Sequence, residues 1–176
     1  MNEQIFHRLY EQYHRDVFNF LMYLVKDRIL VEDLSQEVYI RAIKSYENFQ
    51  QNASEKTWLF AIAKNVAIDH FRKQAVRSKR TAEHFDWETM QLVAREQSPE
   101  NQTLMRADLA ELKEALEQCT GDQKVVVILR FIQQMSVQET AAILNWTESK
   151  VKTTQHRAIH KLKELLEKSS QKEGSV

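Results

Sequence analysis

The sequence predicts an all-α protein made of two small helical domains, an N-terminal helical bundle and a C-terminal helix-turn-helix, joined by a linker. Its 176 residues include only two glycines and one proline, whereas hairpins and phosphate-binding loops depend on glycine for their turns. Apolar residues recur at steps of three and four along most of the chain, which is the period of a helix with one buried face. Two segments also begin with the capping-box pattern that starts helices. Together these observations favour helices throughout.

The N-terminal domain is predicted to span residues 1–75 and to hold three helices. The first carries one apolar stripe, formed by Ile5, Leu9, Tyr13, Val17, Phe20 and Leu24. The second runs from about Glu32 to Tyr46, with Leu34, Val38, Ile40 and Ile43 as its apolar members. The third begins near Ser54 and carries Trp58, Leu59, Ile62, Val66 and Phe71. A bundle this small is only marginally stable alone, because small domains bury a smaller share of their surface.

A linker is predicted for residues 76–102, where the apolar periodicity fades. Ser98–Pro99–Glu100 combines an N-cap residue, a proline at the first helical position and a first-turn acid, so a new helix is expected there. Phe85, Trp87 and Met90 are unusual for a free linker and are compatible with docking of this segment.

The C-terminal domain is predicted for residues 103–170, followed by a tail at 171–176. Thr120 with Gln123, and Ser136 with Glu139, have capping-box form. The first pair opens the helix KVVVILRFI, and the second opens the short helix VQETAAIL, which ends at Asn145. Asparagine tolerates the left-handed conformation of a tight turn. Thr147 then caps a longer basic helix to about Lys168, which completes a helix-turn-helix.

Several classes of protein are disfavoured by what the sequence lacks. The single cysteine, Cys119, excludes an internal disulfide and gives no metal-binding spacing. The polar, charged start does not read as a signal peptide, and the longest aliphatic stretch, Val125–Leu129, is far too short to span a membrane. No P-loop, nucleophile elbow or dinucleotide fingerprint occurs. We therefore expect a cytoplasmic protein that is not an enzyme and binds no cofactor and no small-molecule substrate.

The net charge of zero conceals strong segregation along the chain. Residues 56–82 hold seven basic and one acidic side chain, and residues 124–163 hold seven and two. Between them, residues 83–123 hold three basic and ten acidic side chains. Two basic patches favour two contacts with a polyanion. The alternative is that these runs are ordinary solvated helix faces.

The last helix divides into two faces. Its inward positions are expected to be Val151, Ala158, Ile159, Leu162 and Leu166. Small polar groups and cations fall on another face, namely Ser149, Lys152, Thr153, His156 and His160, with Arg157 at its flank. This mixture suits a helix in the DNA major groove, where cations anchor phosphates and polar groups reach base edges. An amphipathic surface helix is the alternative. His156 and His160 could also hold a metal, but no third ligand is placed near them.

The N-terminal half has a different character. Asp33, Gln36, Glu37 and Ile40 recur at helical steps and form a partly acidic face with an apolar member, as expected for protein docking. A solvated face is the alternative. Lys56 to Arg80 is basic and interleaved with aromatic residues, as single-stranded nucleic acid binding requires, although Trp58 and Phe71 are better explained as core.

The segments DLSQEVYIRA, EKTWLFAIAKNVAIDHFRK and SVQETAAILNWTESKVKTTQHRAIHKLKELL resemble the extracytoplasmic-function sigma factors of the sigma-70 family, in order and spacing. The resemblance implies that Asp33, Gln36, Glu37, Ile40 and Arg41 dock on the β′ clamp helices of RNA polymerase. It implies that the −10 element is bound by Lys56, Lys64, Asn65, Asp69, Arg72 and Lys73, with Asn65 reading a flipped base. It implies that the −35 element is bound by Ser149, Lys150, Lys152, Thr153, His156 and Arg157.

The resemblance also implies partners: core polymerase through its β′ clamp helices and β flap, promoter DNA, and a membrane-anchored anti-sigma factor. A cell-envelope stress regulon is expected on the same ground. Three residues depart from the family pattern, namely Asn145 for the commoner glycine, Thr154 for a basic residue and Gln155 for an aliphatic one. The −35 preference therefore cannot be copied from better-known members.

A stand-alone dimeric helix-turn-helix regulator is the competing interpretation. It would explain residues 120–168 but would leave the acidic docking face and the first basic patch without a function. A sigma factor should co-purify with core polymerase, whereas a stand-alone regulator should bind DNA alone as a dimer.

Overall fold

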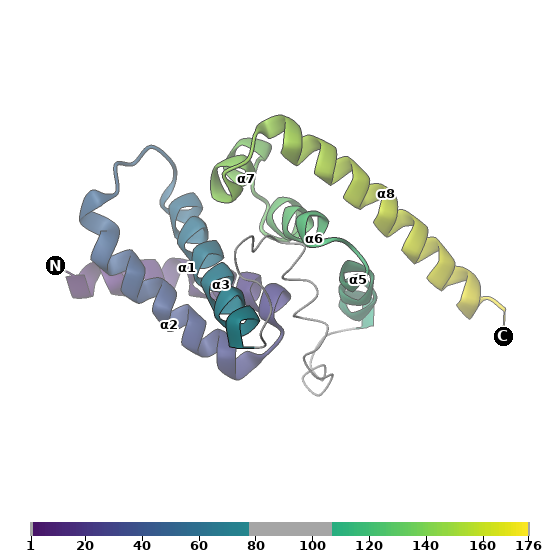
Figure 1. Cartoon of the computed structure of the whole chain (residues 1–176), viewed down its shortest axis with the longest axis horizontal. Coiled ribbons are helices and arrows are strands. Elements are labelled where there is room, and N and C mark those ends of the chain that lie inside the picture. Colours follow the sequence, from purple (N-terminus) through teal and green to yellow (C-terminus); the bar gives the residue numbers. More distant parts are fainter. Residues whose placement is uncertain (1, 78–106, 176) are drawn as a thin grey trace.

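The computed structural model describes residues 2–77 and 107–175, and within those ranges the chain forms helices and no strand (Figure 1). The N-terminal half contains α1 (Asn2–Val25), α2 (Arg28–Ser45), the short 3-10 helix η1 (Tyr46–Asn48) and α3 (Glu55–Arg77). The C-terminal half contains α5 (Ala107–Glu117), α6 (Gly121–Val127), the π-helix η3 (Ile128–Ile132), α7 (Val137–Leu144) and α8 (Glu148–Glu173). The all-α prediction is confirmed for these residues.

The predicted stripe of α1 faces the core of a three-helix bundle. Leu9, Val17, Phe20 and Leu24 are buried, and Ile5 and Tyr13 pack at its edge. Phe20 meets Phe60 of α3 at 5.2 Å between ring centroids. Trp58 packs against the core and Phe71 is fully buried, which confirms that both belong to the core.

Helix α2 begins at Arg28, four residues earlier than the start expected at Glu32. The reason is a local cap, because the Asp27 carboxylate accepts a hydrogen bond from the Leu30 amide at 3.2 Å. The turn before it passes through Lys26, whose φ of 62° is left-handed. The predicted start of α3 near Ser54 is confirmed, since the Ser54 hydroxyl accepts from the Thr57 amide at 3.1 Å.

Both predicted capping boxes are present, at Thr120 with Gln123 and at Ser136 with Glu139. The segment KVVVILRFI is helical as predicted, but its second part winds as a π-helix, in which the Gln133 amide donates to the Ile128 carbonyl at 2.9 Å. Helix α8 continues to Glu173, beyond the end expected near Lys168. It forms one long rod, and α5, α6 and α7 pack against it (Figure 1).

The two halves contact each other. α3 packs against α7, and α1 contacts η3. One continuous cluster of buried side chains therefore includes Leu59, Phe60 and Val66 of α3 together with Val125, Ile143 and Val151 of the C-terminal half. A second cluster, formed by Ala115, Leu116, Cys119, Val127, Ala158 and Leu162, fixes α5 and α6 on α8. The expected helix start at Ser98 and the aromatic residues Phe85 and Trp87, with Met90, lie outside the described residues.

No helix within the described ranges combines the length and apolar character needed to cross a bilayer.

Candidate nucleic-acid and protein-docking sites

The α7–α8 pair forms the helix-turn-helix that its caps predict. Asn145 adopts the left-handed conformation, with φ 56° and ψ 44°, and ends α7. The Trp146 amide donates back to the Ala141 carbonyl at 2.9 Å. Thr147 then caps α8, because its hydroxyl accepts from the Lys150 amide at 3.1 Å. Asparagine at this turn thus supplies the conformation for which glycine is commoner.

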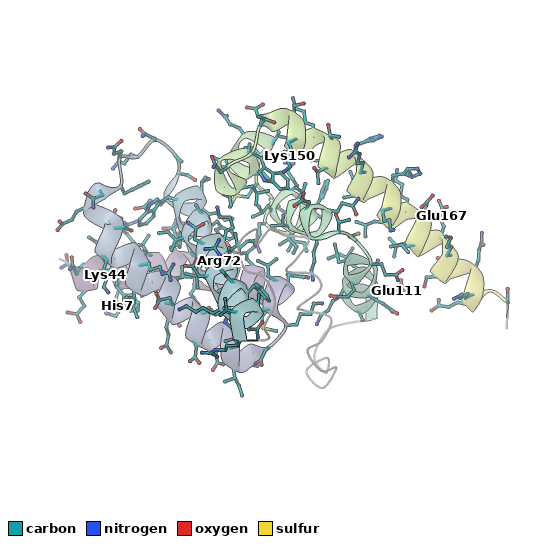
Figure 2. The ribbon with its side chains drawn as sticks, in the orientation of Figure 1. His7, Lys44, Arg72, Glu111, Lys150 and Glu167 are labelled. Carbon is teal, nitrogen blue, oxygen red and sulfur yellow. The ribbon has the colours of Figure 1, made fainter. Side chains whose placement is uncertain are left out.

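The two faces of α8 separate as expected. Val151, Ala158 and Leu162 are buried, and Ile159 and Leu166 are half-buried. Every residue proposed for the −35 element is exposed, namely Ser149, Lys150, Lys152, Thr153, His156 and Arg157. Lys150, labelled in Figure 2, lies 4.0 Å above the Trp146 ring and 4.0 Å from the Asp122 carboxylate. The first turn of α8 therefore presents a cation held in place by an aromatic ring.

Two residues of α8 that depart from the family pattern, Thr154 and Gln155, face partly inward. Thr154 and Gln155 are half-buried, and the Gln155 side-chain oxygen accepts a hydrogen bond from Arg130 Nε at 2.8 Å. Arg130 also donates to the backbone carbonyl of Met135. Arg130 thus links the turn before α7 to α8 through these two hydrogen bonds. Sequence reasoning missed this residue, although a cation inside the apolar segment KVVVILRFI was a signal for it.

The candidate docking face lies on α2. Asp33, Gln36 and Ile40 are exposed, and Ile40 keeps 45% of its surface accessible although it is aliphatic. Glu37 and Arg41 are half-buried and paired, with 2.8 Å between Arg41 Nε and the Glu37 carboxylate. The face therefore combines an exposed aliphatic side chain with acidic and amide groups, as the helical spacing predicts.

The candidate −10 face lies on α3. Asn65, Arg72 and Lys73 are exposed and Asp69 is half-buried beside them. Arg72, labelled in Figure 2, lies 3.7 Å from the Asp69 carboxylate. Lys64 is half-buried, and burial lowers the pKa of its ammonium group.

Lys56 is placed apart from that face. Nine residues separate it from Asn65, which is about two and a half helical turns, so the two side chains leave α3 on opposite sides. Its Nζ lies 3.5 Å from the Asp16 carboxylate and 3.5 Å from the Gln133 carbonyl. Within the described part of the chain, Lys56 therefore serves the junction between the two halves.

The start of α3 is anchored by a network that the sequence did not reveal. Arg8 of α1 donates to both oxygens of Glu55, at 2.6 Å and 2.7 Å, and Tyr46 Oη donates to the same carboxylate at 2.8 Å. These hydrogen bonds lower the pKa of Glu55, with the Arg8 bond as the largest cause. The network ties α1 and η1 to the helix that carries the candidate −10 face.

Among residues 2–77 and 107–175, no group of three or more histidine, cysteine, aspartate or glutamate side chains could hold a metal ion. His156 and His160 are both exposed on α8.

Comparison with known proteins agrees with this geometry. A model of sigma-70 region 2 matches residues 9–77, and a model of sigma-70 region 4 matches residues 109–162. The ECF RNA polymerase sigma factor SigX of Bacillus subtilis is 48% identical over 94% of this chain and 85% of its own length. The RNA polymerase sigma factor YlaC of the same organism is 30% identical over 94% of both chains.

Solved structures show the same fold. The sigma factor RpoE from Bartonella quintana, in complex with the anti-sigma factor NepR, aligns with a TM-score of 0.73 at 23% identity, covering 93% of this chain and 98% of that one. CnrH in complex with the cytosolic domain of CnrY aligns with a TM-score of 0.68 at 21% identity, covering 94% and 89%.

Proposed function

This chain belongs to the extracytoplasmic-function sigma factors of the sigma-70 family, and we propose that its helices divide promoter-specific transcription initiation among three surfaces. The α2 face of Asp33, Gln36, Glu37, Ile40 and Arg41 docks on the β′ clamp helices of core RNA polymerase. The α3 face around Asn65 contacts the −10 element, and the outward face of α8 contacts the −35 element. The stand-alone regulator is not favoured, because region 2 and region 4 models together match both halves of the chain.

The observation that carries this proposal is the outward face of α8. All six proposed −35 residues are exposed, whereas Val151 and Ala158 on the opposite side are fully buried. The helix-turn-helix of which α8 is the second helix is closed by two side-chain caps, Ser136 and Thr147, and by the left-handed Asn145. An exposed basic helix on such a scaffold is what major-groove reading requires.

We propose further partners and a cellular location. Region 4 contacts the polymerase β flap, and the protein works in the cytoplasm, where polymerase and promoter DNA are. A membrane-anchored anti-sigma factor holds it inactive, and its target genes serve the cell envelope. These partners follow from the family resemblance, and the structural neighbours RpoE and CnrH were each solved with a partner, NepR and the cytosolic domain of CnrY. The same resemblance supports a protein that is not itself an enzyme.

The experiment reconstitutes the protein with core polymerase and performs run-off transcription on genomic DNA. We expect a stoichiometric complex and discrete promoter-dependent transcripts. The variant Asp33→Arg with Glu37→Arg should lose co-elution with core polymerase while keeping its helical circular dichroism. Asp33 is exposed, and the accessible ion pair of Glu37 with Arg41 contributes little to folding. Glu164→Arg with Glu167→Arg, both exposed on α8, changes the charge equally and should co-elute normally. A parent protein that binds DNA as a dimer and ignores polymerase would contradict the proposal.

A further inference from the structure

We infer that Asp69 is a positioning residue that links the docking face of α2 to the −10 face of α3, and that it is not itself a contact for promoter DNA. This inference rests on the proposed function, because it concerns the relation between two of the three surfaces assigned there.

The geometry is a chain of four alternating charges that crosses from one helix to the other. Glu37 Oε1 lies 2.8 Å from Arg41 Nε, and Arg41 Nη1 lies 2.8 Å from Asp69 Oδ2. The other Asp69 oxygen, Oδ1, lies 3.7 Å from Arg72 Nη1. Both oxygens of Asp69 are therefore directed at guanidinium groups of the protein, one from each surface.

The charge of Asp69 makes contact with DNA phosphates unfavourable. It is the one acidic residue in the segment 56–82, which otherwise carries seven basic side chains. A carboxylate facing the phosphates of a promoter would be repelled, whereas here two arginines neutralise it within the protein. Asp69 is also the largest cause of the raised pKa of Arg41, ahead of Glu37. The carboxylate thus acts directly on Arg41.

Asp69 orients the side chains of Arg41 and Arg72 and adds little to the stability of the fold. Side chains of Arg41, Asp69 and Arg72 are 37%, 38% and 51% exposed, and ion pairs this accessible contribute little to folding. The planar guanidinium group of an arginine nevertheless holds a defined orientation, because its donors can pair with two carboxylates at once. Arg41 is held between Glu37 and Asp69, and Arg72 is held beside Asp69. A polymerase contact at Glu37 or Arg41 would consequently change how Arg72 is held on the −10 face.

Coupling of this kind must be reciprocal: if docking changes the affinity for −10 DNA, then the −10 face changes the affinity for core polymerase. Removing the central carboxylate should therefore disturb both surfaces, although Asp69 lies on only one of them.

The test is a double-mutant cycle of Arg41→Gln and Asp69→Asn. Each variant is measured for affinity to core polymerase and, as holoenzyme, for affinity to a single-stranded oligonucleotide from the melted region of a promoter mapped with the parent protein. We expect Asp69→Asn to weaken both affinities by about twofold to tenfold, and the double variant to be no weaker than the worse single variant. Arg41→Lys should rescue little, because an ammonium group lacks the planar donors of a guanidinium group.

Additive losses in the double variant, or an Asp69→Asn effect confined to the oligonucleotide, would overturn the inference. Lys73→Gln is the matched control on the same exposed face, since no ion pair joins it to this chain of charges among the described residues. Its loss of oligonucleotide affinity should be the same with Arg41 or Gln at position 41. The variant Asp33→Arg with Glu37→Arg separates the two failures: if it keeps full core affinity, the docking face itself is wrong and the inference falls with it. If Asp33→Arg with Glu37→Arg does lose core affinity, but the losses of Arg41→Gln and Asp69→Asn are additive, only the inference about Asp69 is wrong and the docking face stands.

Discussion

The ammonium group of Lys56 lies 3.5 Å from the Asp16 carboxylate, and this pair sits where the two halves of the chain meet. The same ammonium group lies 3.5 Å from the Gln133 carbonyl, and the Gln133 side chain donates to the Asp16 carbonyl at 3.5 Å. Gln133 is buried although it is polar. Lys56 of α3, Asp16 of α1 and Gln133 directly after η3 therefore form one small polar junction.

Lys56→Met should loosen this junction in the free protein. A partly exposed ion pair is worth up to about 1 kcal/mol, so amide hydrogen exchange in Ile128–Gln133 should accelerate by about twofold to fivefold. Lys44→Met is the control, because Lys44 is exposed on α2 away from the junction. Equal protection in the two variants would show that the ammonium group does not hold the halves together.

Lys124 should make stability depend on pH. The pKa of Lys124 is lowered to about 8, mainly by burial and next by the charge of Lys26, while Glu117, 3.4 Å away, opposes the shift. An unfolded lysine ionises near 10.4, so between pH 8 and 10 the unfolded chain binds more protons and the free energy of unfolding rises with pH. Below pH 8 both states are protonated and this contribution is constant.

Urea denaturation at pH 7, 8 and 9 measures the effect. The free energy of unfolding of the parent, relative to Lys124→Met, should rise by about 1 kcal/mol between pH 8 and 9. The comparison with Lys124→Met removes the contributions of other titrating groups, which both proteins share. Parallel pH profiles for the two proteins would rule out this ionisation.

Ser136→Ala should destabilise the helix-turn-helix. Its hydroxyl accepts from the Glu139 amide at 3.0 Å, while the Glu139 carboxylate accepts from the Ser136 amide at 2.7 Å. Loss of such a cap costs about 1 kcal/mol, and thermal denaturation should show it as a lower Tm. Ser149→Ala, at an exposed position in the first turn of α8, should change stability by less than about 0.5 kcal/mol. Equal effects of both substitutions would contradict the capping role.

The outward face of α8 should divide into anchors and readers. Lys152→Ala and Arg157→Ala should weaken binding to all promoters similarly. Each should also reduce the slope of log binding constant against log salt concentration by about one, because each removes one phosphate contact. Thr153→Ala and His156→Ala should instead alter which promoters are used. Holoenzyme binding to several promoters, measured across a range of salt concentrations, gives both quantities. If all four variants lose affinity in the same sequence-independent way, the division is wrong.

Asn65→Ala should prevent promoter opening. A flipped base costs a few kcal/mol to unstack, and a primary amide can donate and accept at its Watson–Crick edge in return. Permanganate footprinting should therefore show no open complex, although polymerase binding and −35 contacts persist. A premelted −10 bubble should restore only part of the signal, because base recognition is still missing. Normal melting of a fully paired promoter by this variant would exclude the role.

Helices and their caps could be predicted because they depend on near neighbours in sequence. The Thr120 and Ser136 capping boxes each join residues three positions apart, and the left-handed turn at Asn145 follows from the residue itself. The early start of α2 was missed even so, because Asp27 caps the helix at Arg28, four residues before the start expected at Glu32. The three candidate surfaces could be outlined for the same local reason, since each lies along a single helix.

The sequence by itself determined the helical fold class, the capped helix-turn-helix and the exposed face of α8, since all of these follow from spacings of three and four residues. Only the tertiary structure decided that Arg41 reaches Asp69 and that Arg130 reaches Gln155, across 28 and 25 residues of sequence. It also decided that Lys56 joins the two halves instead of facing the same way as Asn65. The reason is physical: helical periodicity specifies which side of one helix a residue occupies, whereas its partner depends on how separate helices cross.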